Sequence, residues 1–110
     1  LRANILLAAE KIAMPIVDYG CYGSTQGPRL ETRAEIVRMR RDGCDLVGMT
    51  GMPEAGLARE LGLDYACLAL VANWAAGCGD GAEITLEEVL ANVNVATASL
   101  PELLKEILKA

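Results

Sequence analysis

Helix-like and strand-like segments alternate along the 110 residues, and this order predicts an α/β fold of three layers, with a β-sheet flanked by helices. Two observations carry the prediction. Apolar residues recur at helical spacing in several segments, whereas the segments 44–49 and 64–73 are short, nearly continuous apolar runs, as in a sheet covered on both faces. Because ligands bind beyond the carboxyl ends of such strands, we expect a site where these runs end in polar residues.

The first 24 residues predict a helix followed by extended backbone. In the segment 1–13 the apolar residues recur on one helix face, at Ile5, Leu6, Ala9 and Ile12. Pro15 ends this helix, because proline cannot donate the backbone hydrogen bond that a helix interior requires. The segment 15–24 then predicts an extended chain, with Gly20 and Gly23 at positions suited to a bulge.

A Gly-Pro turn in residues 25–30 leads into a helix that the sequence itself caps. Thr32 and Glu35 stand at the spacing of a capping box, in which each side chain accepts a hydrogen bond from the backbone of the other residue. The helix is expected to reach about Asp42, with Gly43 as its C-cap. The turn is therefore fixed between a strand and a capped helix.

A short buried strand is expected over 44–49, followed by another helix. Pro53 suits the first position of a helix that reaches Leu61, and Gly62 closes it. The apolar run 64–73 then predicts a strand with both faces covered. The polar ends of the strands, Thr25–Thr32, Met49-Thr50-Gly51 and Asn73-Trp74, are expected to meet in one pocket.

The C-terminal third predicts a loop and two helices. The segment 75–83 is expected to be irregular because it contains Gly77, Gly79 and Gly81. A second capping box over 85–88 begins a helix that reaches about residue 98. The segment 99–102, Ser-Leu-Pro-Glu, then caps a last helix that ends at residue 110, after either a kink or a short break.

The composition excludes two classes of partner. Hydrophobic residues make up 53% of the sequence and charged residues 23%, and no apolar run approaches the roughly 20 residues of a membrane-spanning helix. The net charge is −5 and the ten basic residues are scattered, which argues against a nucleic-acid surface. We therefore expect one domain part over residues 1–110, with neither a membrane nor nucleic acid as a partner.

The cysteines and the missing histidine restrict the chemistry. No Cys-x-x-Cys pair is present, and no histidine can complete a zinc site or a Cys/His catalytic pair, so we expect no metal ion. Scattered reduced cysteines fit a reducing cytoplasm, and they stand at Cys21, Cys44, Cys67 and Cys78. Any catalysis in this segment must therefore depend on other groups.

Three segments, in matching order and spacing, resemble the purine nucleoside phosphorylase and methylthioadenosine phosphorylase family. They are GPRLETRAE (27–35), GCDLVGMTGMPE (43–54) and LVAN (70–73), and the similarity runs from about Ile16 to the end of the chain. The resemblance implies the C-terminal half of a single phosphorylase/hydrolase-like domain, in which helices flank a mixed β-sheet.

The resemblance also implies a reaction. The family is homotrimeric, and its members are pentosyltransferases that cleave a purine nucleoside with inorganic phosphate in purine salvage. Phosphate is a co-substrate and no cofactor is expected. The sugar gains oxocarbenium character, so the enzyme holds phosphate on one face of the ribose and stabilises charge on the departing purine. No covalent nucleophile is needed, which suits a segment without histidine.

Two polar residues match positions that recognise the base. Asn73, the catalytic candidate, would bridge the purine N7 and O6 with its amide; taken alone, without the matching segment, it would better suit a cap at a strand end. Glu31 would accept the N1–H of a 6-oxopurine, and its charge also suits the N-terminus of the following helix. Both roles of Glu31 can hold at once.

Four apolar or hydroxyl residues match further substrate positions. Leu30 stands where the family usually has an aromatic residue, so it offers the base apolar contact without stacking. Val47 would line the base site and Met49 would pack on the ribose, although both suit a plain hydrophobic core. Thr50 would bind phosphate near a helix N-terminus.

Two positions separate the branches of the family. The adenine-specific branch has aspartate at the place of Asn73 and again two residues later, where this chain has Ala75, so the acceptor for a 6-amino group is missing. At Leu86 the 6-oxopurine branch has a histidine for the ribose 5′-hydroxyl, whereas leucine suits a methylthio group or serves only as an apolar helix residue. The combination favours 5′-methylthioinosine, cleaved to hypoxanthine and 5-methylthioribose 1-phosphate.

Other interpretations stay open. The protein could act on inosine and guanosine, or on methylthioadenosine; it could also be an inactive fold fragment, or a nucleotide-binding or assembly module. The family's main phosphate-binding segments have no match here, and the chain begins with Leu1-Arg2-Ala3-Asn4. We therefore expect a chain that starts partway through a larger protein and is catalytically incomplete alone.

Overall fold

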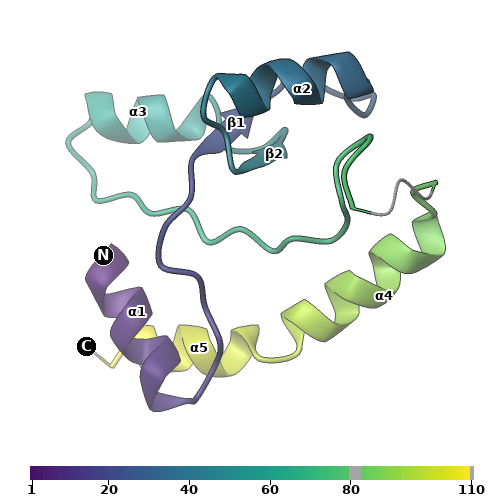
Figure 1. The fold of residues 1–110 in the computed structure, drawn as a ribbon. Helices are drawn as coiled ribbons and strands as arrows, with labels where there is room; N and C mark the ends of the chain where they lie inside the picture. The colour runs from purple at the N-terminus through teal and green to yellow at the C-terminus, as the bar shows by residue number, and fades with distance from the viewer. Residues whose placement is uncertain (80–82, 110) are drawn as a thin grey trace.

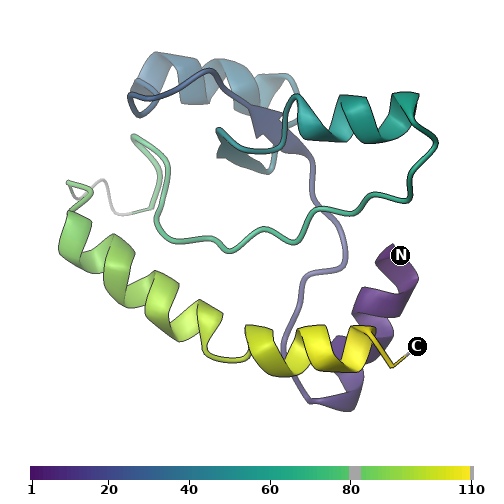
Figure 2. The ribbon, with the colours of Figure 1, turned by 180° about the vertical axis from the view of Figure 1, so that it is seen from behind.

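The computed structural model describes residues 1–79 and 83–109, with helices on two sides of extended chain. In chain order the elements are α1 (Arg2–Lys11), β1 (Tyr22–Ser24), α2 (Arg33–Arg41), β2 (Leu46–Gly48), α3 (Glu54–Glu60), α4 (Leu86–Thr97) and α5 (Leu100–Ile107). Figure 1 shows α2 and α3 on one side, α1, α4 and α5 on the other, and extended segments between them; the view from behind in Figure 2 shows the same separation. The α/β class and the layered arrangement are confirmed.

The sheet of the described residues consists of β1 and β2, which run parallel. Tyr22 lies opposite Leu46 and Ser24 opposite Gly48. The pairing continues past β1, because the Thr25 amide donates to the Gly48 carbonyl at 2.9 Å. Where the resemblance implied a mixed sheet, the described part of the chain therefore contains one parallel pair of short strands.

Helix α2 begins as the capping box predicts. The Thr32 hydroxyl accepts from the Glu35 amide at 3.3 Å, and the Glu35 carboxylate accepts from the Thr32 amide at 2.6 Å. The helix buries Ile36 and Met39, and the Met39 methyl lies against Gly23 of β1. Helix α2 thus covers one face of the strand that leads into the turn.

The chain between α3 and α4 differs from the prediction. The apolar run 64–73 is not a strand: it pairs with no other strand in the described residues, and Val71 is 71% exposed. Exposure still alternates along it, and Leu68 packs against the core around Leu103. The prediction of a doubly covered strand was wrong here, because a strand forms only where a neighbour supplies backbone hydrogen-bond partners.

The tightest packing joins α1 to α5. Ala9 and Leu103 are 0% exposed, and Ala8 completes this core, which is surrounded by Ile12, Met14, Ile16, Leu68, Leu100 and Ile107. Lys11 and Glu106 form an ion pair of 3.1 Å across the two helices. The first and the last helix of the chain consequently lie side by side, as Figure 1 shows.

The C-terminal helices are separated by a break. The Thr85 hydroxyl accepts from the Glu88 amide at 3.2 Å, so the predicted cap of α4 is present. Ser99 precedes α5 but its side chain makes no cap hydrogen bond, because its backbone is helical rather than extended. Gly81 of the expected loop and residue 110, the expected end of the last helix, lie outside the described residues. Within the described ranges, no helix is long and apolar enough to cross a membrane.

Candidate active site

The carboxyl ends of β1 and β2 open into two neighbouring hollows. Both are bordered by Ser24, Thr25 and Gln26. The first hollow, about 420 Å³, is also lined by Gly27, Arg29, Glu31, Glu35, Arg38 and Met39. The second, about 480 Å³, is also lined by Met49, Met52 and Pro53. Two of the three expected strand ends therefore meet, with Thr25 on the border between the hollows.

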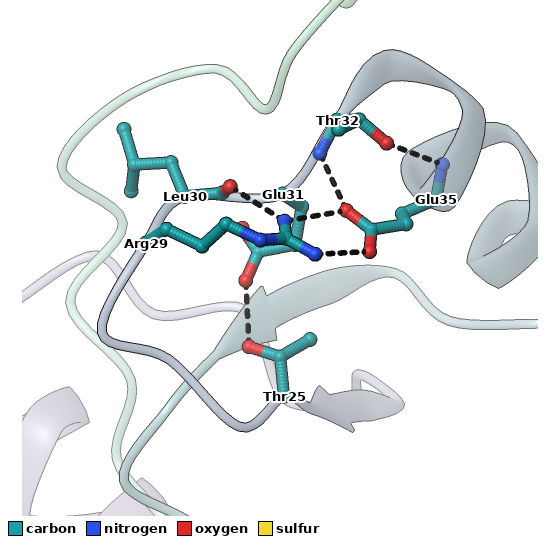
Figure 3. A network of polar contacts seen from close by, with 6 residues as sticks. All are labelled: Thr25, Arg29, Leu30, Glu31, Thr32 and Glu35. Atoms are coloured by element: carbon teal, nitrogen blue, oxygen red, sulfur yellow. Dashed lines mark hydrogen bonds and ion pairs between the residues drawn. The ribbon is translucent and has the colours of Figure 1, made fainter.

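Two sets of polar contacts hold the turn of residues 25–32 (Figure 3). In the first, the Thr25 hydroxyl donates to Oε1 of Glu31 at 2.6 Å. In the second, the two terminal nitrogens of Arg29 donate to the two oxygens of Glu35 at 2.9 and 2.8 Å. Glu35 also accepts from the Thr32 amide, so the turn and the start of α2 share one carboxylate.

The charges of this network favour ionised Glu35. The Arg29 guanidinium, followed by the backbone and side chain of Thr32, lowers the pKa of Glu35 to about 2. The same pair raises the pKa of Arg29. The Arg29 side chain is 68% exposed and that of Glu35 36%, so this is a surface ion pair whose role is to shape the turn.

Tyr22 holds the end of β2 in place. Its hydroxyl accepts from the Thr50 amide at 3.3 Å and lies 3.4 Å from the Thr50 hydroxyl. A Cβ at Gly48 or Gly51 would collide with the Tyr22 ring, so both positions need glycine. Thr50, the residue expected to bind phosphate, is thus fixed three positions before Pro53, the N-cap of α3, although the residue is exposed.

The remaining candidates from the turn and β2 lie around the hollows. Met49 is half-buried and contacts Gly27 of the turn, which has φ +60°. Val47 is half-buried within β2, opposite Gly23. Leu30 is 60% exposed. Among the substrate candidates, the described linings of the two hollows thus include Glu31 and Met49.

The structure places Asn73 and Leu86 outside both described linings. Asn73 is half-buried, and its amide nitrogen donates to the Trp74 carbonyl at 2.8 Å. The preceding carbonyl, that of Ala72, accepts from Asn92 of α4 at 2.7 Å. Leu86 begins α4 and is 73% exposed. The end of the run 64–73, expected to be a third strand end, is therefore anchored to α4, and the structure shows no contact between Asn73 and Glu31 in the described residues.

The loop after Asn73 packs on α2. A Cβ at Gly77 would lie 2.7 Å from Cγ of Arg33, and a terminal nitrogen of Arg40 lies 2.9 Å from the Cys78 sulfur. This packing brings the segment that carries Asn73 to the helix that follows the turn. The loop that follows the run 64–73 thus lies on the same helix that follows the turn after β1.

The sequence interpretation placed Thr25 and Arg29 in the segment expected to line the pocket, but it assigned neither residue a role of its own. Thr25 donates to Glu31 and Arg29 pairs with Glu35. Each pair is separated by six positions, with a Gly-Pro turn between them or beside them. The signal available in the sequence was the spacing: a threonine and an arginine each stand six positions before a glutamate, around a Gly-Pro turn.

Comparison with known proteins identifies relatives in sequence and in fold. A family model described as the phosphorylase superfamily matches residues 1–109. A probable S-methyl-5′-thioinosine phosphorylase from Xylella fastidiosa is 67% identical over 107 residues, which cover 97% of this chain and 43% of the relative. A probable 6-oxopurine nucleoside phosphorylase from Korarchaeum cryptofilum is 40% identical over 109 residues, 99% of this chain and 40% of the relative.

A solved structure shares the fold. Methylthioadenosine phosphorylase from Schistosoma mansoni, in complex with adenine, superimposes with a TM-score of 0.83 at 26% identity, over 96% of this chain and 43% of that one. The chain thus spans about two fifths of the length of the relatives it matches. Since the family match covers nearly every residue, the chain belongs to the phosphorylase superfamily.

Proposed function

We propose that the full-length protein containing this chain cleaves 5′-methylthioinosine with phosphate, giving hypoxanthine and 5-methylthioribose 1-phosphate. The observation that carries the proposal is the Glu31 carboxylate, which lines the hollow at the strand ends with one oxygen held by Thr25. An ionised carboxylate only accepts hydrogen bonds, so it suits the N1–H of a 6-oxopurine. The 67% identical relative carries the name of a probable thioinosine phosphorylase, which supports the same substrate class.

The reaction exchanges one bond at the sugar. A phosphate oxygen bonds to C1′ while the bond from C1′ to the purine breaks, and the electron pair of that bond moves to the base. Asn73 would stabilise this charge by bridging N7 and O6. Its amide now donates to the adjacent Trp74 carbonyl, a contact that the purine would replace.

The ribose and phosphate would lie toward β2. Met49 would pack on the ribose, and Val47 and Leu30 would offer apolar contact to the base. Thr50 would bind phosphate, with its amide and hydroxyl oriented by Tyr22. The rest of the domain would supply most of the phosphate site, with this chain as the C-terminal part of one subunit in a cytoplasmic homotrimer.

The 5′ end of the nucleoside distinguishes the nearest alternative. Leu86 offers a methylthio group an apolar surface, but an apolar site rejects an added hydroxyl by only about 100-fold. A phosphorylase of inosine and guanosine is therefore the second candidate, favoured by the relative named as a 6-oxopurine nucleoside phosphorylase.

Hypoxanthine release tests the proposal directly. The full-length protein is incubated with phosphate and with 5′-methylthioinosine, inosine or methylthioadenosine, and kcat/KM is measured for each. We expect the highest value for 5′-methylthioinosine. A clear preference for inosine would establish the second candidate, and preference for methylthioadenosine would remove the role of Glu31. If no base is released from any nucleoside, the protein would instead be interpreted as a binding or assembly module.

A further inference from the structure

The side chain of Thr25 has a contact that the fold does not require. Its backbone amide already donates to the Gly48 carbonyl at 2.9 Å, which attaches the residue to β2. Its hydroxyl lies 2.6 Å from Oε1 of Glu31 and 3.3 Å from the same Gly48 carbonyl. A hydroxyl has one hydrogen, and the shorter contact to a charged acceptor takes it. The hydroxyl is therefore committed to Glu31.

Glu31 has no comparable donor elsewhere in the described contacts. Arg29 is close enough to attract it, but the side-chain hydrogen bonds of Arg29 go to Glu35 at 2.8 and 2.9 Å, and a third goes to the Leu30 carbonyl. Figure 3 shows the two carboxylates held on separate partners, Glu31 by Thr25 and Glu35 by Arg29. Thr25 thus determines the orientation of the Glu31 carboxylate.

We propose that Thr25 is a positioning residue that gives the site its selectivity for 6-oxopurines, an inference that rests on the proposed function. With Oε1 fixed by the hydroxyl, Oε2 remains as the acceptor for the base. A 6-oxopurine presents N1–H, which can donate to Oε2; a 6-aminopurine presents the lone pair of N1, which repels it. A carboxylate that is free to rotate discriminates less between 6-oxopurines and 6-aminopurines. Binding of the 6-oxopurine must then also supply the free energy that orients the carboxylate.

Two substitutions separate the hydroxyl from the shape of the residue. Thr25→Val keeps the branched side chain and the backbone hydrogen bond but removes the donor, whereas Thr25→Ser keeps the donor. A hydrogen bond to a charged group contributes enough that we expect Thr25→Val to lower kcat/KM for 5′-methylthioinosine about tenfold or more. The loss should fall on KM for the nucleoside, and Thr25→Ser should restore most of it.

The control readouts distinguish positioning from general damage. In the full-length Thr25→Val protein, KM for phosphate and kcat/KM for methylthioadenosine should stay at wild-type values, so that the preference for the 6-oxopurine narrows. Thr97→Val is the matched control, because the Thr97 hydroxyl donates to the Val93 carbonyl within α4 at 2.8 Å, outside the site. In Thr97→Val, the ratio of kcat/KM for 5′-methylthioinosine over methylthioadenosine should be unchanged.

The following results would overturn the inference. Equal losses for both nucleosides would mean that Thr25 serves only the fold, and failure of Thr25→Ser to restore the preference would mean that the hydroxyl is not the cause. If Thr25→Val does not fold, Thr25→Ala is measured in its place, and the same decrease in the preference for the 6-oxopurine nucleoside is expected. A wild-type protein that cleaves no 6-oxopurine nucleoside would overturn the proposed function as well, whereas an unchanged preference in an active Thr25→Val protein overturns this inference alone.

Discussion

Gly27 and Met49 are in close contact: a Cβ added to Gly27 would lie 2.6 Å from the Met49 sulfur. The contact joins the turn to the residue that follows β2, although 22 positions separate the two in the sequence. Gly27 also has φ +60°, in the left-handed region that side chains other than glycine disfavour. The glycine is therefore required both by its backbone and by its neighbour.

Substitution of Gly27 separates these two requirements. Gly27→Ala should lose about 1–2 kcal/mol of unfolding free energy from the left-handed backbone, and more from displacement of Met49. Gly62→Ala is the matched control, because Gly62 has φ +66° with nothing within 4 Å of an added Cβ. Denaturant unfolding and phosphorolysis of the full-length variants measure both effects. We expect only Gly27→Ala to weaken nucleoside binding; equal effects of the two substitutions would contradict the contact.

The Arg29–Glu35 pair should make stability depend on pH at the acid end. The pKa of Glu35 is about 2 in the folded chain against an ordinary value of 4.5, so its stabilisation is complete above pH 4.5 and is lost as the pH falls toward 2. Glu35→Gln should therefore lower Tm at pH 7, and the difference from wild type should shrink between pH 4.5 and 2. Glu87→Gln, in the first turn of α4, is the control. A difference that stays constant over this range would contradict the assignment.

Asn73 is expected to carry the stabilisation of the leaving purine. Asn73→Ala should lower kcat by about 100-fold or more, as removal of a donor to a developing negative charge does elsewhere, while circular dichroism and Tm stay near wild type. Asn73→Asp should shift preference toward 6-aminopurines. Asn94→Ala, on α4, provides an amide control. Near-normal turnover by Asn73→Ala would show that the residue is only a turn former.

Leu86 should influence the 5′ end of the nucleoside. Leu86→His introduces a donor for the ribose 5′-hydroxyl in place of the apolar surface, so the ratio of kcat/KM for 5′-methylthioinosine over inosine should fall about tenfold. Leu90→His is the control, since Leu90 lies one turn further along α4 and is also exposed. An unchanged ratio for Leu86→His would remove Leu86 from the site.

The elements that the sequence predicts best are those with a local cause. Thr32 and Glu35 satisfy each other's backbone within four residues, so the start of α2 follows from the sequence alone. The end of the same helix, at Asp42 and Gly43, has an equally local cause in the positive φ of glycine. Thr85 gives the start of α4 in the same way.

The elements that depend on distant partners were harder to predict. Residues 64–73 have the composition of a buried strand, but pairing depends on neighbours that local composition does not specify. The bond between Thr25 and Glu31 depends on how the Gly-Pro turn closes, because only the closed turn brings positions six apart within 2.6 Å. The residue types of the candidate site followed from the resemblance to the family. The hydrogen bonds that hold those residues in place follow only from the three-dimensional structure.

The turn is held in place by its own polar contacts, through Thr25 to Glu31 and through Arg29 and Thr32 to Glu35. Fixing one residue's backbone costs roughly 1–2 kcal/mol, and in this chain the ordering of the turn accompanies folding rather than ligand binding. The site is in this sense preorganised: under the proposed function, a purine that enters the hollow would meet an acceptor already in position. Under the proposed function, affinity for the base should then be sensitive to Arg29, which lines the same hollow but pairs with Glu35 rather than with Glu31.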